Sequence, residues 1–159
     1  MSIKVTLLLA AILIIGISPS LSQATSDSKQ KDIAKGRYLI EIAGCNDCHT
    51  SGYAPAAGKV AENQWLMGDG LGFRGPWGTT YPANLRSHIN KLSEDEWVAR
   101  SRSLQTRPPM PWWILNTMNE DDLRAIHRYI RSLGNSDNPV PAYLPPGVEP
   151  KTPFILWPG

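Results

Sequence analysis

One short motif constrains this chain more than any other feature: the run Cys45-Asn46-Asp47-Cys48-His49. It contains both cysteines of the chain, and a histidine directly follows the second one. The C-x-x-C-H pattern is the attachment signature of c-type haem. Thiols at this spacing lie about one helical turn apart, so each can bond one vinyl group of the same porphyrin. The motif therefore predicts one haem c, covalently attached through Cys45 and Cys48, with His49 as an axial ligand to the iron.

Two other uses of the cysteine pair are weaker. A thioredoxin-type redox pair requires a βαβ context, and no alternating or β-branched strand pattern follows the motif. A zinc site requires four ligands, and outside the motif the histidines are His88 and His127, with no second close pair. No second C-x-x-C-H run occurs, so we expect a single haem per chain.

Residues 1–24 have the pattern of a secretory signal peptide. One positive charge in residues 1–4 precedes an apolar run at residues 5–17, and small residues surround Ala24. The apolar run is shorter than the roughly 20 residues that a transmembrane helix needs. We expect cleavage after Ala24, export to the periplasm and no membrane span in the mature chain. An uncleaved N-terminal anchor is the alternative.

Charge and composition narrow the remaining function classes. The chain has 16 Lys and Arg residues against 14 Asp and Glu residues, so no broad positive field favours nucleic acid or a membrane surface. Gly and Pro together make up 27 of 159 residues, which is high for a helical bundle and low for a disordered chain. A haem would supply the apolar core that loops rich in these residues can wrap.

The spacing of apolar residues predicts three helices, at residues 32–43, 93–104 and 120–133. Gly44 is placed to end the first helix, and Gly36 would let the first and third helices cross closely. Ser93 and Glu96 form a capping box at the start of the second helix. Residues 49–91 show almost no periodic pattern and are expected to form loops around the haem.

A methionine is the expected sixth ligand of the iron. Met110 lies between Pro109 and Pro111, which disfavour a helix and hold an extended loop whose thioether can face the iron. Met67, in the Gly-rich loop after the motif, is the second choice. Met118 directly precedes the Asn119 cap and is explained by packing onto Leu123. His88 and His127 are lesser candidates.

The haem motif and the Met110 loop together resemble class I c-type cytochrome domains. The similarity runs from Gly36-x-Tyr38-Leu39 through the motif to Pro109-Met110-Pro111-Trp112 and on to the helix at residues 122–129, and it covers about residues 32–134. It is nearest to the cytochrome c domains that act as electron-transfer subunits of bacterial periplasmic dehydrogenases. The resemblance implies an all-α, cytochrome c-like fold of three or more helices, with long loops around the haem.

With cleavage after Ala24, the domain is expected at residues 25–134, and the resemblance implies His49 and Met110 as axial ligands and an exposed haem edge. The expected function is a monohaem electron carrier that cycles between Fe(III) and Fe(II) and is not itself an enzyme. Its redox partner would be a periplasmic dehydrogenase or a terminal oxidase. The alternatives are a haem enzyme or gas sensor with a dissociable sixth ligand, for which Arg107 is the nearest distal candidate, and a domain without haem.

Two segments depart from a minimal cytochrome. The segment at residues 65–82 is a long insertion that carries several aromatic residues. Tyr81 at its end, or Asn84 or Arg86 just after it, could bond haem propionates. Asn84 could equally hold a turn, and Arg86 could be solvated. Residues 135–159 form a Pro-rich tail that should be extended rather than helical. The tail ends in Phe154-Ile155-Leu156-Trp157, which would either pack on its own domain or dock onto a partner subunit.

Overall fold

The computed structural model describes residues 21–157. Most of the expected signal peptide, residues 1–20, lies outside the described residues. The helices and strands are α1 (Leu21–Ile42), α2 (Cys45–His49), the 3-10 helix η1 (Glu62–Gln64), β1 (Gly72–Gly75), β2 (Gly78–Thr80), α3 (Leu85–Ile89), α4 (Glu94–Ser103), α5 (Trp113–Thr117), α6 (Glu120–Ser132) and β3 (Phe154–Leu156).

The three predicted helices are present as α1, α4 and α6. α1 begins earlier than expected, at Leu21, and Gly44 follows it in a left-handed conformation with a φ of 68°. At the start of α4, the Ser93 hydroxyl accepts a hydrogen bond from the Glu96 N–H, and the Glu96 carboxylate accepts one from the Ser93 N–H. The predicted capping box is therefore confirmed.

α1 and α6 cross closely at Gly36. A β-carbon at this position would lie 2.0 Å from the carbonyl oxygen of Ala125 and 2.7 Å from Cβ of Tyr129, so only a glycine fits. Around this crossing α1 and α6 bury the centre of the apolar core, which includes Ile40, Leu123, Ile126, Tyr129 and Ile130. The packing of the first and third predicted helices through Gly36 is confirmed.

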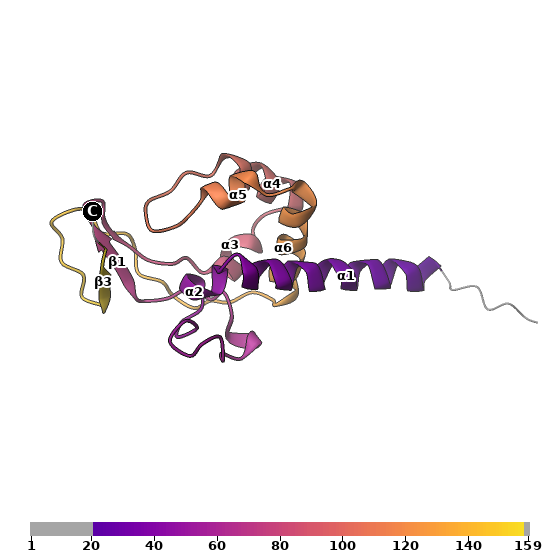
Figure 1. The fold of residues 1–159 in the computed structure, drawn as a ribbon, viewed down its shortest axis with the longest axis horizontal. Helices are drawn as coiled ribbons and strands as arrows, with labels where there is room; N and C mark the ends of the chain where they lie inside the picture. The colour runs from indigo at the N-terminus through magenta and orange to yellow at the C-terminus, as the bar shows by residue number, and fades with distance from the viewer. Residues whose placement is uncertain (1–20, 158–159) are drawn as a thin grey trace, which may run out of the picture.

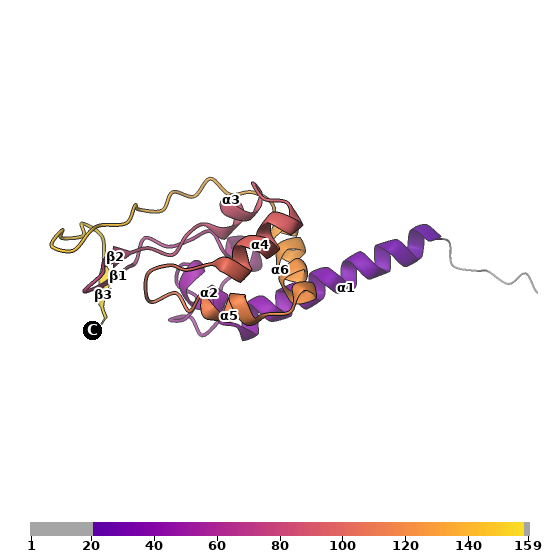
Figure 2. The same ribbon diagram turned by 90° about the horizontal axis from the view of Figure 1, so that it is seen from above.

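A small sheet of order β2-β1-β3 is an addition to the expected all-α fold. β1 and β2 form an antiparallel hairpin, and β3 pairs in parallel with β1, with Phe73 opposite Ile155. The sheet lies at the end of the molecule away from the start of α1 (Figures 1 and 2). The protein is thus helical with a three-stranded sheet, because the tail supplies a strand to a hairpin some 80 residues earlier.

The C-terminal tail is extended and packs against its own chain. Residues 135–157 contain no helix. The Asn84 side chain donates hydrogen bonds to the carbonyl groups of Ser136 and Asn138, and Leu144 forms a bridge with Thr79. Figure 2 shows the tail running along one side of the molecule to the sheet. The terminal apolar side chains nevertheless remain exposed, from 37% for Phe154 to 73% for Leu156.

Ion pairs join α4 to α6. Arg128 of α6 donates to both carboxylate oxygens of Glu94 on α4, at 2.8 and 2.9 Å. Arg124 of α6 pairs with Asp95 on α4, and also with Glu120 within α6. Within residues 21–157, no helix combines the length and the apolar character needed to cross a bilayer.

Candidate cofactor site

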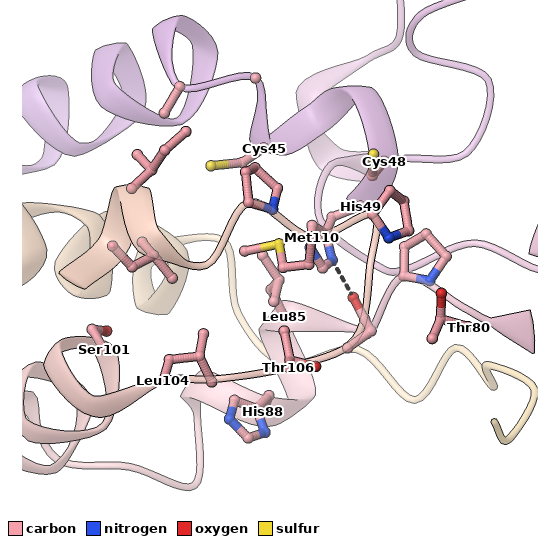
Figure 3. A pocket seen from close by; sticks show the side chains of 18 of the residues that line it. Cys45, Cys48, His49, Thr80, Leu85, His88, Ser101, Leu104, Thr106 and Met110 are labelled. Atoms are coloured by element: carbon pink, nitrogen blue, oxygen red, sulfur yellow. Dashed lines mark hydrogen bonds between the residues drawn. The ribbon is translucent and has the colours of Figure 1, made fainter. Parts of the chain in front are cut away.

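A single cavity of about 370 Å³ brings together all four predicted haem-binding residues, Cys45, Cys48, His49 and Met110. This volume falls in the range of about 300–1,000 Å³ that is typical of small-molecule sites. Figure 3 shows the two cysteines on α2 and Met110 on the loop that precedes α5. The apolar part of the wall includes residues of α1, β1, α3, α5, α6 and the loop after α4, namely Ile40, Phe73, Leu85, Leu104, Leu115, Ile126 and Ile130.

The motif itself is the short helix α2, held from outside the cavity. Both cysteines are free thiols rather than a disulfide. The Thr50 hydroxyl donates to the side-chain oxygen of Asn46 at 2.7 Å and accepts from the backbone N–H of Leu66 at 2.8 Å. Asn46 and Thr50 are both buried, so this chain of hydrogen bonds fixes the end of α2 against the following loop.

His49 presents one specific nitrogen for coordination. Its Nδ1 lies 2.8 Å from the carbonyl oxygen of Ala83, and the ring is buried. Because a carbonyl oxygen can only accept, Nδ1 carries the proton and Nε2 keeps its lone pair. Burial lowers the pKa of His49, against the opposing effect of the bond to Ala83, so the ring stays neutral. A neutral imidazole oriented by a backbone carbonyl is the usual form of a metal-ligating histidine.

Burial also keeps the two cysteines in the thiol form. It raises the pKa of Cys45 to about 11, with a further contribution from the nearby Asp47 carboxylate. Burial is the main cause of the raised pKa of Cys48 as well, with Asp47 and Asp69 adding to it. These thiols are therefore poor nucleophiles in the folded chain, unlike those of a thioredoxin-type redox pair.

The structure separates the candidate sixth ligands. Met110 lines the cavity and is half-buried, and the loop before it is tied to β2 by a 2.8 Å hydrogen bond from the Thr80 hydroxyl to the Pro108 carbonyl. Met118 and His88 also line the cavity. Among the described residues, Met67 does not line it. His127 is buried on α6, with Nε2 3.0 Å from the Leu92 carbonyl oxygen, as expected for a core histidine.

Polar residues that sequence reasoning did not identify occupy part of the cavity wall. They are Arg100, Ser101, Thr106 and Tyr143. Arg107, the distal candidate from the sequence, lines the cavity as well. Ser101 is fully buried, and its hydroxyl has no hydrogen-bond partner among residues 21–157. An apolar cavity whose wall includes an unpaired hydroxyl and arginine side chains fits a flat apolar group with carboxylate substituents, as haem is. No local pattern marks these positions, because only the tertiary fold turns them toward one cavity.

The three candidate propionate partners lie in different structural surroundings. Tyr81 lines the cavity, with its hydroxyl 3.0 Å from the Thr152 hydroxyl. Asn84 caps α3 by accepting from the Ser87 N–H, so it holds a turn. Both interpretations of Arg86, as a propionate partner and as a solvated side chain, are wrong. This residue is neither part of the cavity wall nor solvated. It is buried, and its guanidinium donates to the carbonyl groups of Trp65, Glu62 and Leu133.

The chain is similar to cytochrome subunits of two bacterial dehydrogenases. It is 25% identical over 115 residues to the fructose dehydrogenase cytochrome subunit of Gluconobacter japonicus, covering 66% of this chain and 22% of that protein. It is 28% identical over 130 residues to the gluconate 2-dehydrogenase cytochrome c subunit of Pantoea cypripedii, covering 72% of this chain and 30% of that protein. The chain therefore spans less than a third of the length of either relative. No protein-family model and no solved structure matches it.

Proposed function

We propose that this chain is a monohaem c-type cytochrome that carries electrons in the periplasm and has a cytochrome c-like domain at residues 25–134. The observation that carries the proposal is the convergence of Cys45, Cys48, His49 and Met110 on one apolar cavity. The similarity to cytochrome subunits of dehydrogenases supports the same function. In this proposal residues 1–24 are a signal peptide and residues 135–159 are an extended tail.

The haem would supply the redox chemistry, because its iron gains or loses a single electron. Cys45 and Cys48 would hold it by thioether bonds, and His49 and Met110 would be its axial ligands. His49 is prepared for this role, since the Ala83 carbonyl orients the ring and leaves Nε2 unprotonated. Arg100 and Ser101 line the cavity and would supply donors for the haem carboxylates. The apolar wall would exclude water from the iron, which limits reorganisation during electron transfer.

The redox partner in this proposal is a periplasmic dehydrogenase that delivers electrons to the haem. Both relatives are named as subunits of dehydrogenases, which supports a partner of this class. The protein is therefore proposed to act as a carrier, and the partner is proposed to oxidise the substrate.

Spectroscopy of purified protein, expressed with the haem-attachment machinery, tests this function. We expect a pyridine haemochrome spectrum of one haem c per chain. We also expect the near-red sulfur-to-iron charge-transfer band in the oxidised protein and no spectral change when carbon monoxide is added to the reduced protein. A colourless product would contradict the haem site, and rapid carbon monoxide binding would favour the enzyme or gas-sensor alternative.

Two methionine variants identify the sixth ligand. Met110→Ala should lose the near-red band and lower the reduction potential, because a thioether favours Fe(II). Met118→Ala is the matched control, since Met118 lines the same cavity from the end of α5. If the band survives in Met110→Ala and disappears in Met118→Ala, the ligand assignment passes to Met118.

A further inference from the structure

The segment just before Met110 is held between β2 and the C-terminal tail. The Thr80 hydroxyl on β2 donates to the Pro108 carbonyl at 2.8 Å. On the other side, the guanidinium carbon of Arg107 lies 3.7 Å from the centre of the Tyr143 ring, which belongs to the tail. Both contacts therefore hold the chain at positions within three residues of Met110.

Tyr143 is itself firmly attached to the hairpin. Its hydroxyl donates to the Trp77 carbonyl at 2.9 Å, and the next residue, Leu144, exchanges both backbone hydrogen bonds with Thr79, at 2.8 and 3.0 Å. Gly78 has a φ of 98°, and a β-carbon there would lie 2.2 Å from the Leu144 carbonyl oxygen. The tail thus lies directly against β2, the same strand that holds Pro108.

The tail also forms part of the cavity wall. Tyr143 and Pro141 line the cavity together with Arg107 and Met110. An arginine over an aromatic face is attracted to it, and the planar guanidinium loses little freedom when it stacks. The Arg107–Tyr143 contact therefore links the position of the tail to the position of the loop that carries Met110.

We infer that Tyr143 is a positioning residue for Met110: through Arg107, the tail locks the Met110 loop against the cavity. This inference rests on the proposed function, because it takes Met110 as the sixth ligand. It gives the tail a role within its own chain, beyond supplying a third strand. Weakening the lock should let small external ligands displace the Met110 sulfur from the iron more easily.

Imidazole binding to the oxidised haem protein measures this competition directly. Tyr143→Leu removes the aromatic face, and we expect its apparent affinity for imidazole to rise about five-fold. Its near-red band should also disappear at a lower temperature than in the wild type. Tyr143→Phe keeps the ring and should stay closer to the wild type. Arg107→Gln removes the other partner of the contact and should match Tyr143→Leu.

Phe154→Leu is the matched control for the tail. The guanidinium carbon of Arg74 lies 5.4 Å from the Phe154 ring centre, so this variant removes a cation–aromatic contact of the same tail that does not involve the Met110 loop. We expect wild-type imidazole affinity from it. Equal affinities in Tyr143→Leu and Phe154→Leu would overturn the inference, as would additive effects of Arg107→Gln and Tyr143→Leu in a double-mutant cycle.

The spectrum of the wild-type protein distinguishes failure of this inference from failure of the proposed electron-carrier function on which it rests. If the oxidised wild type shows the near-red band but the Tyr143 variants leave imidazole affinity unchanged, the lock fails and the carrier function stands. If the wild type binds haem and lacks the band, Met110 is not the ligand, and both the axial assignment and the lock fail. Should Tyr143→Leu not fold, Arg107→Gln still decides the result from the loop side of the contact.

Discussion

Gly36 and Ala125 touch backbone to backbone where α1 crosses α6, so closely that a β-carbon on Gly36 would lie 2.0 Å from the Ala125 carbonyl oxygen. This contact brings Ile40 of α1 beside Ile126 and Ile130 of α6, and all three side chains line the proposed haem cavity. The helix crossing therefore shapes one wall of the site as well as stabilising the fold.

Gly36→Ala should destabilise the protein by about 2–3 kcal/mol, because neither backbone can withdraw without moving a whole helix. Urea unfolding followed by far-UV circular dichroism measures the change. Gly70→Ala is the control, since a β-carbon there would meet no atom within 4 Å, and we expect a change of less than about 0.5 kcal/mol. Equal effects at the two positions would show that the crossing tolerates a side chain.

Local patterns predicted the features of the fold that depend on neighbouring residues. The helix stripe around Gly36 and the capping box at Ser93 are examples, and both are confirmed. The sheet was not predicted, because β1 and β2 contain glycines and no alternation, and β3 pairs with β1 across a long stretch of chain. α3 and α5 have five residues each, too few to show a helical period.

The candidate site also has residues that the sequence predicts and residues that only the tertiary fold reveals. The C-x-x-C-H run and the prolines around Met110 are visible in the sequence, and the structure places all four residues at one cavity. The roles of Ser101, Tyr143 and Arg86 depend on atoms far away in the chain. Arg86 illustrates the limit, because the carbonyl groups that it binds belong to two distant segments, residues 62–65 and the end of α6.

Arg86→Met should cost about 3 kcal/mol of stability, because it removes the charged donor of one buried and two partly buried hydrogen bonds to backbone carbonyl groups. Arg102→Met is the control. Arg102 is 52% exposed and pairs with Glu120 at 3.4 Å, so its loss should cost less than about 0.5 kcal/mol. Urea unfolding compares the two. Folded Arg86→Met should keep the wild-type reduction potential, whereas a large shift would restore Arg86 as a propionate partner.

The Glu94–Arg128 pair predicts a specific dependence of stability on pH. The hydrogen bonds from Arg128 are the main reason that the pKa of Glu94 is lowered in the folded protein. A carboxyl with a lowered pKa adds stability above its unfolded pKa and loses that contribution as the pH falls through its folded pKa. Glu94→Gln should therefore be less stable than the wild type at neutral pH, by about 1 kcal/mol.

The difference between the two proteins should shrink in acid, as the pH falls below the unfolded pKa of a glutamate, about 4.3, and then through the lower folded pKa of Glu94. Urea unfolding at a series of pH values measures it. Glu149→Gln is the control, because the Glu149 side chain is 68% exposed in its pair with Arg74 and should contribute less. A gap between wild type and Glu94→Gln that stayed constant into acid would contradict this account of the ion pair.

The two thiols should differ in reactivity before haem attachment and be equally unreactive after it. In reduced, haem-free protein at about pH 8, iodoacetamide should alkylate Cys48 faster than Cys45, because only the thiolate reacts and burial raises the pKa of Cys45 to about 11. Peptide mass spectrometry gives the rate at each site. In urea both cysteines should react at similar rates, which controls for intrinsic reactivity.

In the haem-loaded protein, neither cysteine should react even in urea, because both sulfurs are then thioethers. One reactive thiol in the denatured, haem-loaded protein would mean a single attachment bond, and faster alkylation of Cys45 in the folded, haem-free protein would contradict its deeper burial.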